Sequence, residues 1–516
     1  MPDTPLSPQL PLADRFTAEY LTYWRLLPLE ILDGRLRVAV AGEADPEVLE
    51  DLQQLYGAPV ELVPVEEADL QDAIRRTFAA SESVVELVRD LDATAGTPLD
   101  PSDDALTDVR DLANQPPVIR FVNLLIREAH NASASDIHLE ATRDGLRVRL
   151  RVDGVLTELP APPRGLQAAV VSRVKLLAEL EFAERRVPQD GRIRVRLESR
   201  ELDLRVSTVP TLFGESVVLR LLDRGGRPVT LDELGMAPET LETFRRLVGR
   251  AHGILLSTGP TGSGKTTTLY AALGLRHPSE EKIVTVEDPV EYHLPGITQV
   301  PVHAKAGMTF AAALRSLLRQ DPDVMMVGEM RDAETAAIAV QAAMTGHLVF
   351  STLHTNDAVS ALTRLTDLKV EPYMIAATVE AVLAQRLVRR VCPDCRESYR
   401  PDPELLNLGC SGTARDALAG SIGTGGRAGV SRRATAFHRG RGCGACRETG
   451  FKGRVGLFEL MVMTDELRQA LLGTPNLGAL RSLARNQGMV TLREDGWRKA
   501  VAGITTIEEV LRVVGE

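Results

Sequence analysis

The stretch Gly259–Thr266 (GPTGSGKT) constrains the fold of this chain most strongly, because it matches the pattern G-x-x-x-x-G-K-[ST] in full. The apolar segment GILLSTG precedes it and predicts a buried strand, and TTLYAALG follows as the start of a helix. In that context the loop's backbone N–H groups surround phosphates, Lys265 reaches the β and γ phosphates, and the Thr266 hydroxyl binds Mg²⁺. A nucleoside triphosphate site is therefore predicted; a glycine-rich turn that binds nothing is the weaker alternative.

Short apolar segments and helical patterns continue to alternate from about Leu231 to Arg390. Continuous apolar strands between helices are typical of a parallel sheet that is covered on both faces. The predicted fold class is therefore α/β. Several domains are expected, because 516 residues exceed the usual size of one domain.

Two further units are predicted upstream. Residues 1–80 resemble a small α/β unit, in which Asp45 caps a helix that starts at Pro46 and ends at Gly57. Residues 113–226 are predicted to be an α+β domain, whose strands are separated by acidic and glycine turns. The predicted strands are 35–41, 60–65, 146–151, 193–197, 202–206 and 216–222, and further helices are predicted at 66–78 and 118–130.

Composition marks the segments between and after these units. Residues 81–112 are predicted to be a flexible linker, because the stretch 92–108 is acidic and rich in proline and small residues. Residues 409–442 are rich in Gly, Ser, Ala and Arg, which predicts a mobile insertion. The tail from about Leu457 is predicted to be helical. The predicted division is 1–80, 81–112, 113–226, 227–390, 391–455 and 456–516.

Carboxylates follow two of the predicted buried strands. Glu329 ends DVMMVGE, where an acid can orient Mg²⁺ or its water. Glu287, Asp288 and Glu291 lie in IVTVEDPVEY, and ligand sites of α/β proteins form at such strand ends. One of these carboxylates could position the attacking water. The alternatives are a core strand that ends in a solvated acid, and a charged surface turn.

Arginines and histidines supply further candidates. Thr309 can cap a helix on which Arg315 and Arg319 lie four residues apart on one face. They could meet phosphate or a neighbouring subunit, or form a solvated face. In GHLVFSTLHTND, His347 begins and His354 ends a predicted strand. A histidine that ends a strand beside a phosphate loop can sense the γ-phosphate, whereas a lone histidine is usually structural.

Four of the five cysteines form two CxxC pairs, Cys392 with Cys395 and Cys443 with Cys446. Four thiolates complete the tetrahedral coordination of Zn²⁺, so a structural zinc site is predicted. Redox chemistry is the alternative. Cys410, in the predicted insertion, receives no role.

Charge and hydropathy limit the partners and the location. The net charge of −11 makes nucleic acid an unexpected partner, because duplex-binding proteins are more often basic. The sequence has no uninterrupted apolar run of about 18 residues, and its N-terminus lacks a basic region followed by an apolar one. We therefore expect a cytosolic protein whose association with membranes is indirect.

Ordered blocks from Asn114 onward resemble the secretion ATPase superfamily, specifically the type II secretion ATPases (GspE) and the type IV pilus-assembly ATPases. The blocks are SASDIHLE (133–140), RVPQDGRI (186–193), LRVSTVPTLFGESVVLRLLD (204–223), GPTGSGKTTTLY (259–270), TVEDPVEY (285–292), LRQDPDVMMVGEMRDAETA (318–336), TGHLVFSTLHTNDA (345–358) and the CxxC pairs. The resemblance implies a RecA-like P-loop motor domain, an α+β (PAS-like) middle domain and a small N-terminal α/β domain that selects the partner.

The resemblance also implies roles for individual residues. Gly259–Thr266 is the Walker A loop, Glu329 is the Walker B acid, and Glu291 is the general base of an aspartate box. The middle-domain arginines Arg205 and Arg220 reach nucleotide phosphate on domain closure. The residues expected to bind nucleotide are Gly259, Pro260, Thr261, Gly262, Ser263, Gly264, Lys265, Thr266, Thr267, Glu287, Asp288, Arg315, Arg319, Arg331, His347 and His354. The residues expected to be catalytic are Glu291, Glu329, Lys265, Arg205 and Arg220.

The resemblance further implies a homo-hexameric ring at the cytoplasmic face of the inner membrane, with ATP, Mg²⁺ and Zn²⁺ as cofactors. The N-terminal domain would dock on a cytoplasmic adaptor or an inner-membrane platform protein. We expect ATP hydrolysis that powers protein export by a type II secretion system through pseudopilus assembly. A type IV pilus-assembly (extension) ATPase shares every motor motif and stays open as an alternative. A non-hydrolysing nucleotide-binding scaffold is a further alternative.

Overall fold

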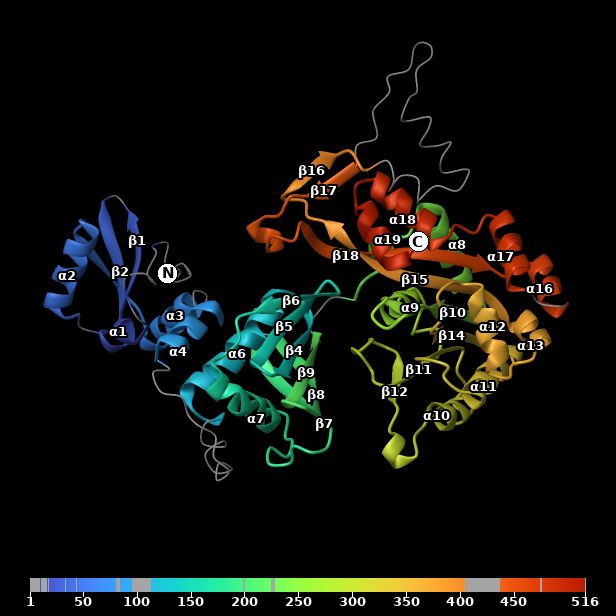
Figure 1. Ribbon diagram of the computed structural model, residues 1–516, viewed down its shortest axis with the longest axis horizontal. Helices are drawn as coiled ribbons and strands as arrows, with labels where there is room; N and C mark the ends of the chain where they lie inside the picture. Colours follow the sequence, from blue (N-terminus) through green and yellow to red (C-terminus); the bar gives the residue numbers. More distant parts are fainter. Residues whose placement is uncertain are drawn as a thin grey trace, which may run out of the picture. The chain divides into compact units, whose positions relative to one another are not determined.

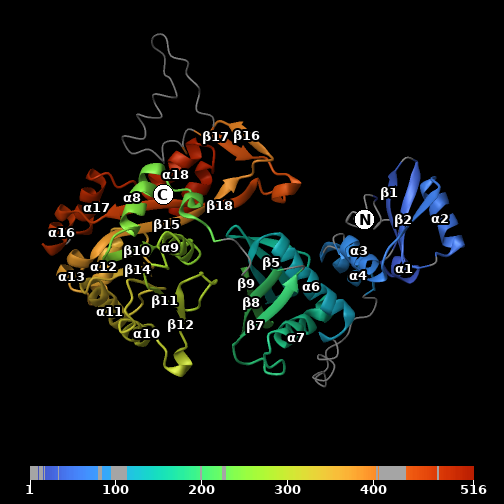
Figure 2. The ribbon, with the colours of Figure 1, turned by 180° about the vertical axis from the view of Figure 1, so that it is seen from behind.

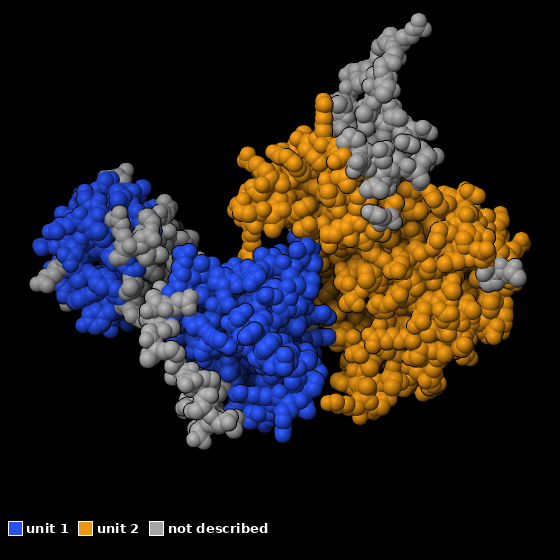
Figure 3. All heavy atoms as spheres, viewed as in Figure 1, with its two compact units in different colours: residues 1–197, 203–221 blue, residues 198–202, 222–516 orange. Residues whose placement is uncertain are grey.

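The chain forms two compact units, residues 1–197 with 203–221, and residues 198–202 with 222–516 (Figure 3). Each unit has its own sheets and its own apolar cores. The computed structural model describes residues 10, 16, 18–32, 34–42, 44–79, 84–94, 113–197, 200–223, 228–402, 405, 437–473 and 476–515.

The first unit begins with a three-stranded sheet in the order β1-β2-β3, in which β2 pairs antiparallel with β1 and parallel with β3. Its elements are α1 (Ala18–Tyr23), β1 (Leu26–Leu32), β2 (Arg35–Val40), α2 (Pro46–Tyr56), β3 (Val60–Pro64), α3 (Glu67–Ala79) and α4 (Val84–Thr94). The predicted strands and helices are confirmed here. The prediction of a flexible linker over 81–112 is wrong at Val84–Thr94, which forms α4, because Val84, Leu87 and Val88 recur at helical spacing and are buried. Strand β1 was not predicted, because LLPLEIL contains a proline and does not alternate between apolar and polar residues.

The first unit also contains a six-stranded sheet in the order β6-β5-β4-β9-β8-β7. Its elements are α6 (Pro116–Asn131), β4 (Ala134–Thr142), β5 (Gly145–Val152), β6 (Val155–Leu159), α7 (Gln167–Leu177), β7 (Gln189–Leu197), β8 (Arg200–Thr211) and β9 (Gly214–Asp223). In strand β4, Ile137 and Leu139 are buried, and the buried Asp136 pairs with arginines of the neighbouring strands. The four predicted strands and the helix are confirmed, and β4, β6 and α7 are additional.

The second unit is built on a seven-stranded sheet in the order β12-β11-β13-β14-β10-β15-β18, parallel except for β18 at one edge. Helices cover both of its faces (Figures 1 and 2). Its strands are β10 (Gly253–Thr258), β11 (Ile283–Glu287), β12 (Thr298–Pro301), β13 (Val324–Val327), β14 (Leu348–Leu353), β15 (Val379–Val391) and β18 (Phe451–Val462). The predicted α/β fold class is confirmed.

Buried side chains on the two faces of this sheet enter separate cores. In β10, Ile254 and Leu256 contribute to one core and Leu255 to the other, and every residue of the strand is buried. The helices of this unit are α8 (Pro238–Val248), α9 (Lys265–Leu273), α10 (Phe310–Leu317), α11 (Ala333–Met344), α12 (Ser360–Asp367), α13 (Pro372–Thr378), α16 (Asp465–Leu472), α17 (Leu477–Asn486), α18 (Leu492–Val501) and α19 (Ile507–Val514). Thr309 accepts the Ala312 N–H at the start of α10, as predicted.

Two predictions for the C-terminal part are wrong at their margins. The tail is not helical from Leu457, because β18 continues to Val462 and the first helix, α16, begins at Asp465. The apolar residues of β18 pair with β15, and this sheet contact outweighs their helical pattern.

The last part of the 409–442 insertion is also ordered, since β17 (Phe437–Gly440) pairs antiparallel with β16 (Arg396–Tyr399). Cys410 and the rest of the insertion lie outside the described residues, as do residues 95–112 of the predicted linker.

Among the described residues, no helix combines the length and the apolarity that a membrane span requires.

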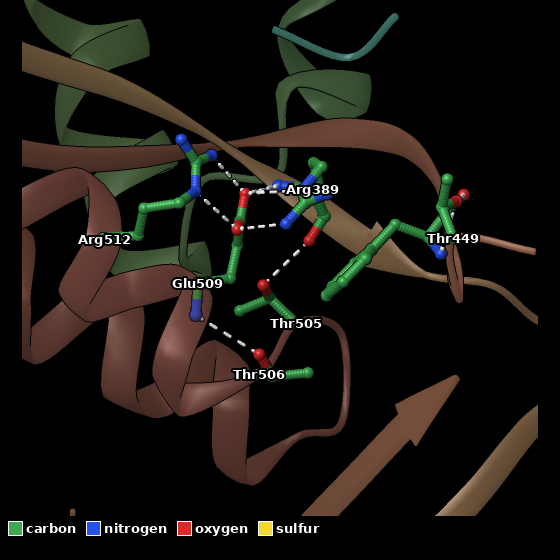
Figure 4. Close-up of polar contacts among 7 residues, drawn as sticks. Arg389, Thr449, Thr505, Thr506, Glu509 and Arg512 are labelled. Atoms are coloured by element: carbon green, nitrogen blue, oxygen red, sulfur yellow. Dashed lines mark hydrogen bonds and ion pairs between the residues drawn. The ribbon is translucent and has the colours of Figure 1, made fainter. Parts of the chain in front are cut away.

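A buried ion cluster fixes the last helix to the central sheet (Figure 4). The Glu509 carboxylate of α19 accepts hydrogen bonds from Arg389 of β15 at 3.0 and 2.9 Å, and from Arg512. The Thr505 hydroxyl donates to the Arg389 carbonyl at 2.8 Å, and Thr506 caps the helix. Burial alone would raise the pKa of Glu509, but the hydrogen bonds from Arg512 and Arg389 outweigh it and lower this pKa to about 2.

The first prediction concerns this cluster. Because the folded state lowers the Glu509 pKa below the value of about 4.3 for an unfolded glutamate, its contribution is fully present above that pH and is lost as pH falls toward 2. Glu509→Gln should lower the free energy of unfolding at pH 7 by about 2 kcal/mol, and this difference should shrink below pH 4. Denaturant unfolding of both proteins across pH 3–7 measures it, with the exposed Glu508→Gln as matched control. An equal deficit at pH 3 and pH 7 would contradict the prediction.

Candidate functional site

The phosphate loop lies between β10 and α9, and three of its glycines are required by its geometry. Gly259, Gly262 and Gly264 all have positive φ angles, of 152°, 78° and 87°. A Cβ atom on Gly259 would lie 2.5 Å from the carbonyl oxygen of Gln385, and one on Gly264 would lie 2.8 Å from the Gln385 side-chain amide. Strand β15 therefore closes against the loop, and only glycine allows this approach. Pro260, Thr261 and Gly262 are exposed, Ser263 is buried, and Thr266 and Thr267 are half-buried.

Lys265 is the buried cation of this loop, with 8% of its surface exposed. Its Nζ donates to the carbonyl oxygens of Gly259 at 2.8 Å and Pro260 at 3.0 Å. Burial lowers the pKa of Lys265 to about 8; the nearby Glu329 opposes this shift and Arg386 adds to it. The Ser263 hydroxyl is buried without a hydrogen-bond partner among the described residues. A buried ammonium bonded to neutral carbonyls and an unsatisfied hydroxyl fit the oxygens of a phosphate group.

The carboxyl ends of β13 and β14 bring Glu329 and His354 together beside this loop. The strands are adjacent and parallel, so the residues that follow them meet at one edge of the sheet. One Glu329 oxygen lies 3.3 Å from His354 Nε2 and 2.7 Å from Arg331 Nε, and the Glu329 side chain is only 12% exposed. Four of the predicted site residues therefore lie near one another here: Glu329, which contacts Arg331 and His354, and Lys265, whose charge interacts with that of Glu329.

The three carboxylates of the 285–292 segment have different surroundings. Glu287 is 2% exposed, and its carboxylate accepts hydrogen bonds from the Thr285 hydroxyl at 2.5 Å, the Gln299 side chain at 3.2 Å and the Tyr270 hydroxyl. Asp288 is exposed, and Glu291 is half-buried. The structure therefore holds Glu287 in the protein interior, with its oxygens engaged, rather than presenting it to a ligand.

The other predicted residues of this unit lie elsewhere on it. Arg315 is exposed on α10 and pairs with Glu334. The prediction that the same helix carries Arg319 is wrong, because α10 ends at Leu317 and Arg319 lies in the turn that follows, where it is exposed and donates to the Arg315 carbonyl at 2.9 Å. His347 precedes β14, so it lies at the opposite end of that strand from His354. Its Nδ1 is within 2.8 Å of the Ala342 carbonyl oxygen. These three residues are not brought to the phosphate loop of their own chain.

Arg205 and Arg220 meet within the first unit. Both line a cavity of about 530 Å³ on the six-stranded sheet, together with Asp190, Gly191, Arg192, Val206, Ser207 and Val218. Arg220 Nε lies 3.1 Å from Asp136 Oδ1, and its side chain is more than half exposed. The predicted pair therefore forms part of a hollow that is lined by three arginines and one aspartate.

The four CxxC cysteines gather into one cluster, with all sulfur atoms within 4.8 Å of one another. The Sγ atoms of Cys392 and Cys443 are 4.0 Å apart, and those of Cys395 and Cys446 are 3.8 Å apart. Ligands at about 2.3 Å from a tetrahedral Zn²⁺ lie about 3.8 Å from one another, so the cluster fits this ion and leaves no open position. Backbone N–H groups of Cys443 and Gly450 donate to the Cys446 sulfur, as expected around a metal-bound thiolate.

Comparison with known proteins agrees with this geometry. The model of the family described as "Type II/IV secretion system protein" matches residues 111–512, and that of the MshEN domain matches residues 2–84. The chain belongs to the type II secretion ATPase family. It is 46% identical over 512 residues to "Type II secretion system protein E" of Xanthomonas campestris pv. campestris, which covers 99% of this chain and 86% of that protein.

Two further comparisons support the family and the fold. "Type II secretion system ATPase E" of Vibrio cholerae serotype O1 is 42% identical over 480 residues, covering 91% of this chain and 90% of that protein. The solved structure of the Legionella pneumophila ATPase DotB covers 76% of this chain and 94% of its own, with a TM-score of 0.54 at 22% identity, and shows a shared fold. The family predicted from the ordered sequence blocks is confirmed.

Three side chains of this secretion ATPase that contact the phosphate-loop region were not singled out from the sequence. Gln385 packs against the loop, and its Oε1 accepts the Thr268 hydroxyl at 2.7 Å. Arg386 is buried and donates to the Asn356 carbonyl at 3.0 Å, and Tyr270 contacts Glu287. For Gln385 and Arg386 the sequence signal was two adjacent polar residues that follow the apolar run AVLA and precede LV.

The second prediction tests the cysteine cluster. The purified protein should hold about one zinc per chain, and Cys443→Ser should lower both the zinc content and the melting temperature, because structural zinc contributes directly to folding. Metal analysis and thermal unfolding measure the two effects. Cys410→Ser is the matched control and should retain the metal. Full zinc content in Cys443→Ser would refute the assignment of this ligand.

Proposed function

We propose that this chain hydrolyses ATP to power protein export by a type II secretion system, as the motor of pseudopilus assembly. The single observation that carries the proposal is the meeting of Lys265, Glu329 and His354 at one edge of the parallel sheet. That arrangement supplies a buried cation for phosphate and a carboxylate for a metal ion at the same place. Family membership supports the same activity.

In the proposed reaction the loop Gly259–Thr266 surrounds the β and γ phosphates of ATP. Lys265 exchanges its contacts with the loop carbonyls for contacts with phosphate oxygens. Mg²⁺ would be held by the Thr266 hydroxyl and by Glu329, directly or through water, and would offset phosphate charge when bound. Glu291 accepts a proton from the water that attacks the γ-phosphate in line, and His354 senses the presence of that phosphate.

Arg205 and Arg220 complete the proposed site from the first unit. In the described state Arg220 pairs with Asp136, so reaching a phosphate requires it to exchange one anionic partner for another. Two additional cations near the γ-phosphate favour closure while ATP is present. Loss of that phosphate after hydrolysis removes the attraction, and this coupling would convert the chemistry into movement.

The proposed assembly is a homo-hexamer at the cytoplasmic face of the inner membrane. Arg315 on α10 and Arg319 just after it are exposed, and Arg331 is exposed beside Glu329, which suits contacts with a neighbouring subunit. The MshEN-type N-terminal region would dock on a cytoplasmic adaptor or a membrane-platform protein. A type IV pilus-assembly role would use the same motor, and co-purification with a secretion or a pilus platform protein separates the two.

The third prediction tests turnover. ATP hydrolysis should depend on Mg²⁺ and should rise more than proportionally with protein concentration, because the active form is an oligomer. Lys265→Ala should abolish nucleotide binding, and Glu291→Gln should lower kcat by about 100-fold while nucleotide still binds. Lys305→Ala, an exposed lysine, is the matched control. Full turnover in either site variant would contradict the proposal. If the wild type binds nucleotide but does not hydrolyse it, the non-hydrolysing nucleotide-binding scaffold is favoured instead.

The fourth prediction concerns the arginines of the first unit. Arg220→Ala should lower kcat at least ten-fold with little change in the Kd for ADP, because ADP lacks the γ-phosphate that the guanidinium is proposed to meet. Steady-state kinetics and a fluorescent ADP analogue measure the two quantities. Arg147→Ala, on the same sheet but outside the cavity lining, serves as the control. An equal loss of ADP affinity would contradict the proposed contact.

A further inference from the structure

Tyr270 connects the phosphate-loop helix to the segment that carries Glu291. It lies on α9, five residues after Lys265, and is 2% exposed. Its hydroxyl donates to the Glu287 carboxylate and accepts the backbone N–H of Glu291 at 3.3 Å. The Gln299 side-chain amide lies 3.4 Å from the same hydroxyl oxygen. One phenol oxygen therefore contacts Glu287, the backbone of Glu291 and the Gln299 side chain.

Gln299, on β12, holds the same segment from its other end. Its Oε1 accepts the Leu294 N–H at 2.8 Å, and its Nε2 donates to the Tyr292 carbonyl at 3.1 Å. The rings of Tyr270 and Tyr292 also pack edge to face, with centroids 4.6 Å apart. Side chains, rather than sheet pairing, thus fix the backbone between β11 and β12 at Glu291, Tyr292 and Leu294.

The electrostatics favour a fixed direction for these hydrogen bonds. Within the described parts of the chain, no cationic side chain lies within ion-pair distance of the buried Glu287, so its carboxylate depends on its hydrogen-bond donors. Burial, and then the hydrogen bond to Glu287, raise the pKa of Tyr270 far above its ordinary value. The phenol stays protonated, donates to Glu287, and keeps its lone pairs for the Glu291 N–H and Gln299.

We propose that Tyr270 is a positioning residue for Glu291, and that Glu287 serves catalysis by holding Tyr270 rather than by touching nucleotide. This inference rests on the proposed role of Glu291 as general base. Because Tyr270 is on the helix that begins at Lys265, it ties the position of the base to the position of the phosphate loop. The two parts of the reaction, the γ-phosphate and the water, are then placed by one rigid element.

Tyr270→Phe tests the proposal, because it removes only the hydroxyl. We expect kcat for ATP to fall about ten-fold, as for a small misplacement of a catalytic group, while the Kd of a non-hydrolysable ATP analogue changes less than two-fold. Backbone amide exchange in the segment 288–294 should become faster, since the Glu291 N–H loses its acceptor. Kinetics, analogue binding and hydrogen–deuterium exchange on the purified full-length chain measure the three.

Two control variants separate positioning from general damage. Tyr292→Phe removes the hydroxyl of the other ring of the pair, which makes none of these hydrogen bonds, and should leave kcat unchanged. Glu287→Gln retains an acceptor for the phenol, whereas Glu287→Leu removes it. The loss of kcat should be larger in Glu287→Leu, again with unchanged analogue binding, and this comparison replaces Tyr270→Phe if that variant does not fold.

The outcomes also separate this inference from the proposed function. If Glu291→Gln is inactive but Tyr270→Phe keeps wild-type kcat and exchange, the positioning role is overturned and the proposed function stands. If Tyr270→Phe loses analogue binding together with kcat, the residue is structural and the inference is again overturned. If Glu291→Gln retains turnover, the proposed function fails, and the exchange rate in 288–294 still decides whether Tyr270 holds that backbone.

Discussion

The close contact between the phosphate loop and strand β15 shapes the whole nucleotide site. A Cβ atom on Gly259 would lie 2.5 Å from the Gln385 carbonyl oxygen, and one on Gly264 would lie 2.8 Å from the end of the Gln385 side chain. This contact requires β10 to lie between β14 and β15 in the middle of the sheet, where both of its faces are covered. The backbone around it therefore holds the loop in place. Lys265 is buried there with its Nζ hydrogen-bonded to loop carbonyl oxygens rather than to a carboxylate.

The segment that follows β14 contacts both the phosphate-loop region and the C-terminal elements of the same unit. The Thr355 N–H donates to the Thr258 hydroxyl at 2.8 Å, immediately before the phosphate loop. Asp357 pairs with Arg481 of α17 at 2.9 Å, and the Ala358 N–H donates to Glu459 of β18 at 2.8 Å. The end of β14 is thus in contact with both the nucleotide site and the C-terminal part of the same unit, which gives a physical route by which the two could influence each other.

Much of the fold could be predicted from local patterns. The continuous apolar strands around Gly259–Thr266 predicted a parallel sheet, and the alternating stretches upstream predicted most strands of the first unit. The failures have two causes. Strand β1 pairs with the neighbouring β2, but its proline and its lack of alternation hid it. The strand part of the tail at 457–462 depends on pairing with β15, which is distant in sequence, and such pairing leaves no periodic trace in the segment itself.

The sequence by itself determined the family, the phosphate loop and the two CxxC pairs, because each is carried by residue types at short, fixed spacings. The tertiary structure decided which carboxylates and histidines can serve the site. Glu287 and Glu291 are four residues apart, yet only the fold buries the first against Tyr270. His347 and His354 flank one strand, and the direction of that strand alone places His354 beside Glu329 and His347 at the far end. Sequence spacing fixes which groups are near along the chain, whereas strand order and direction fix which of them share a ligand.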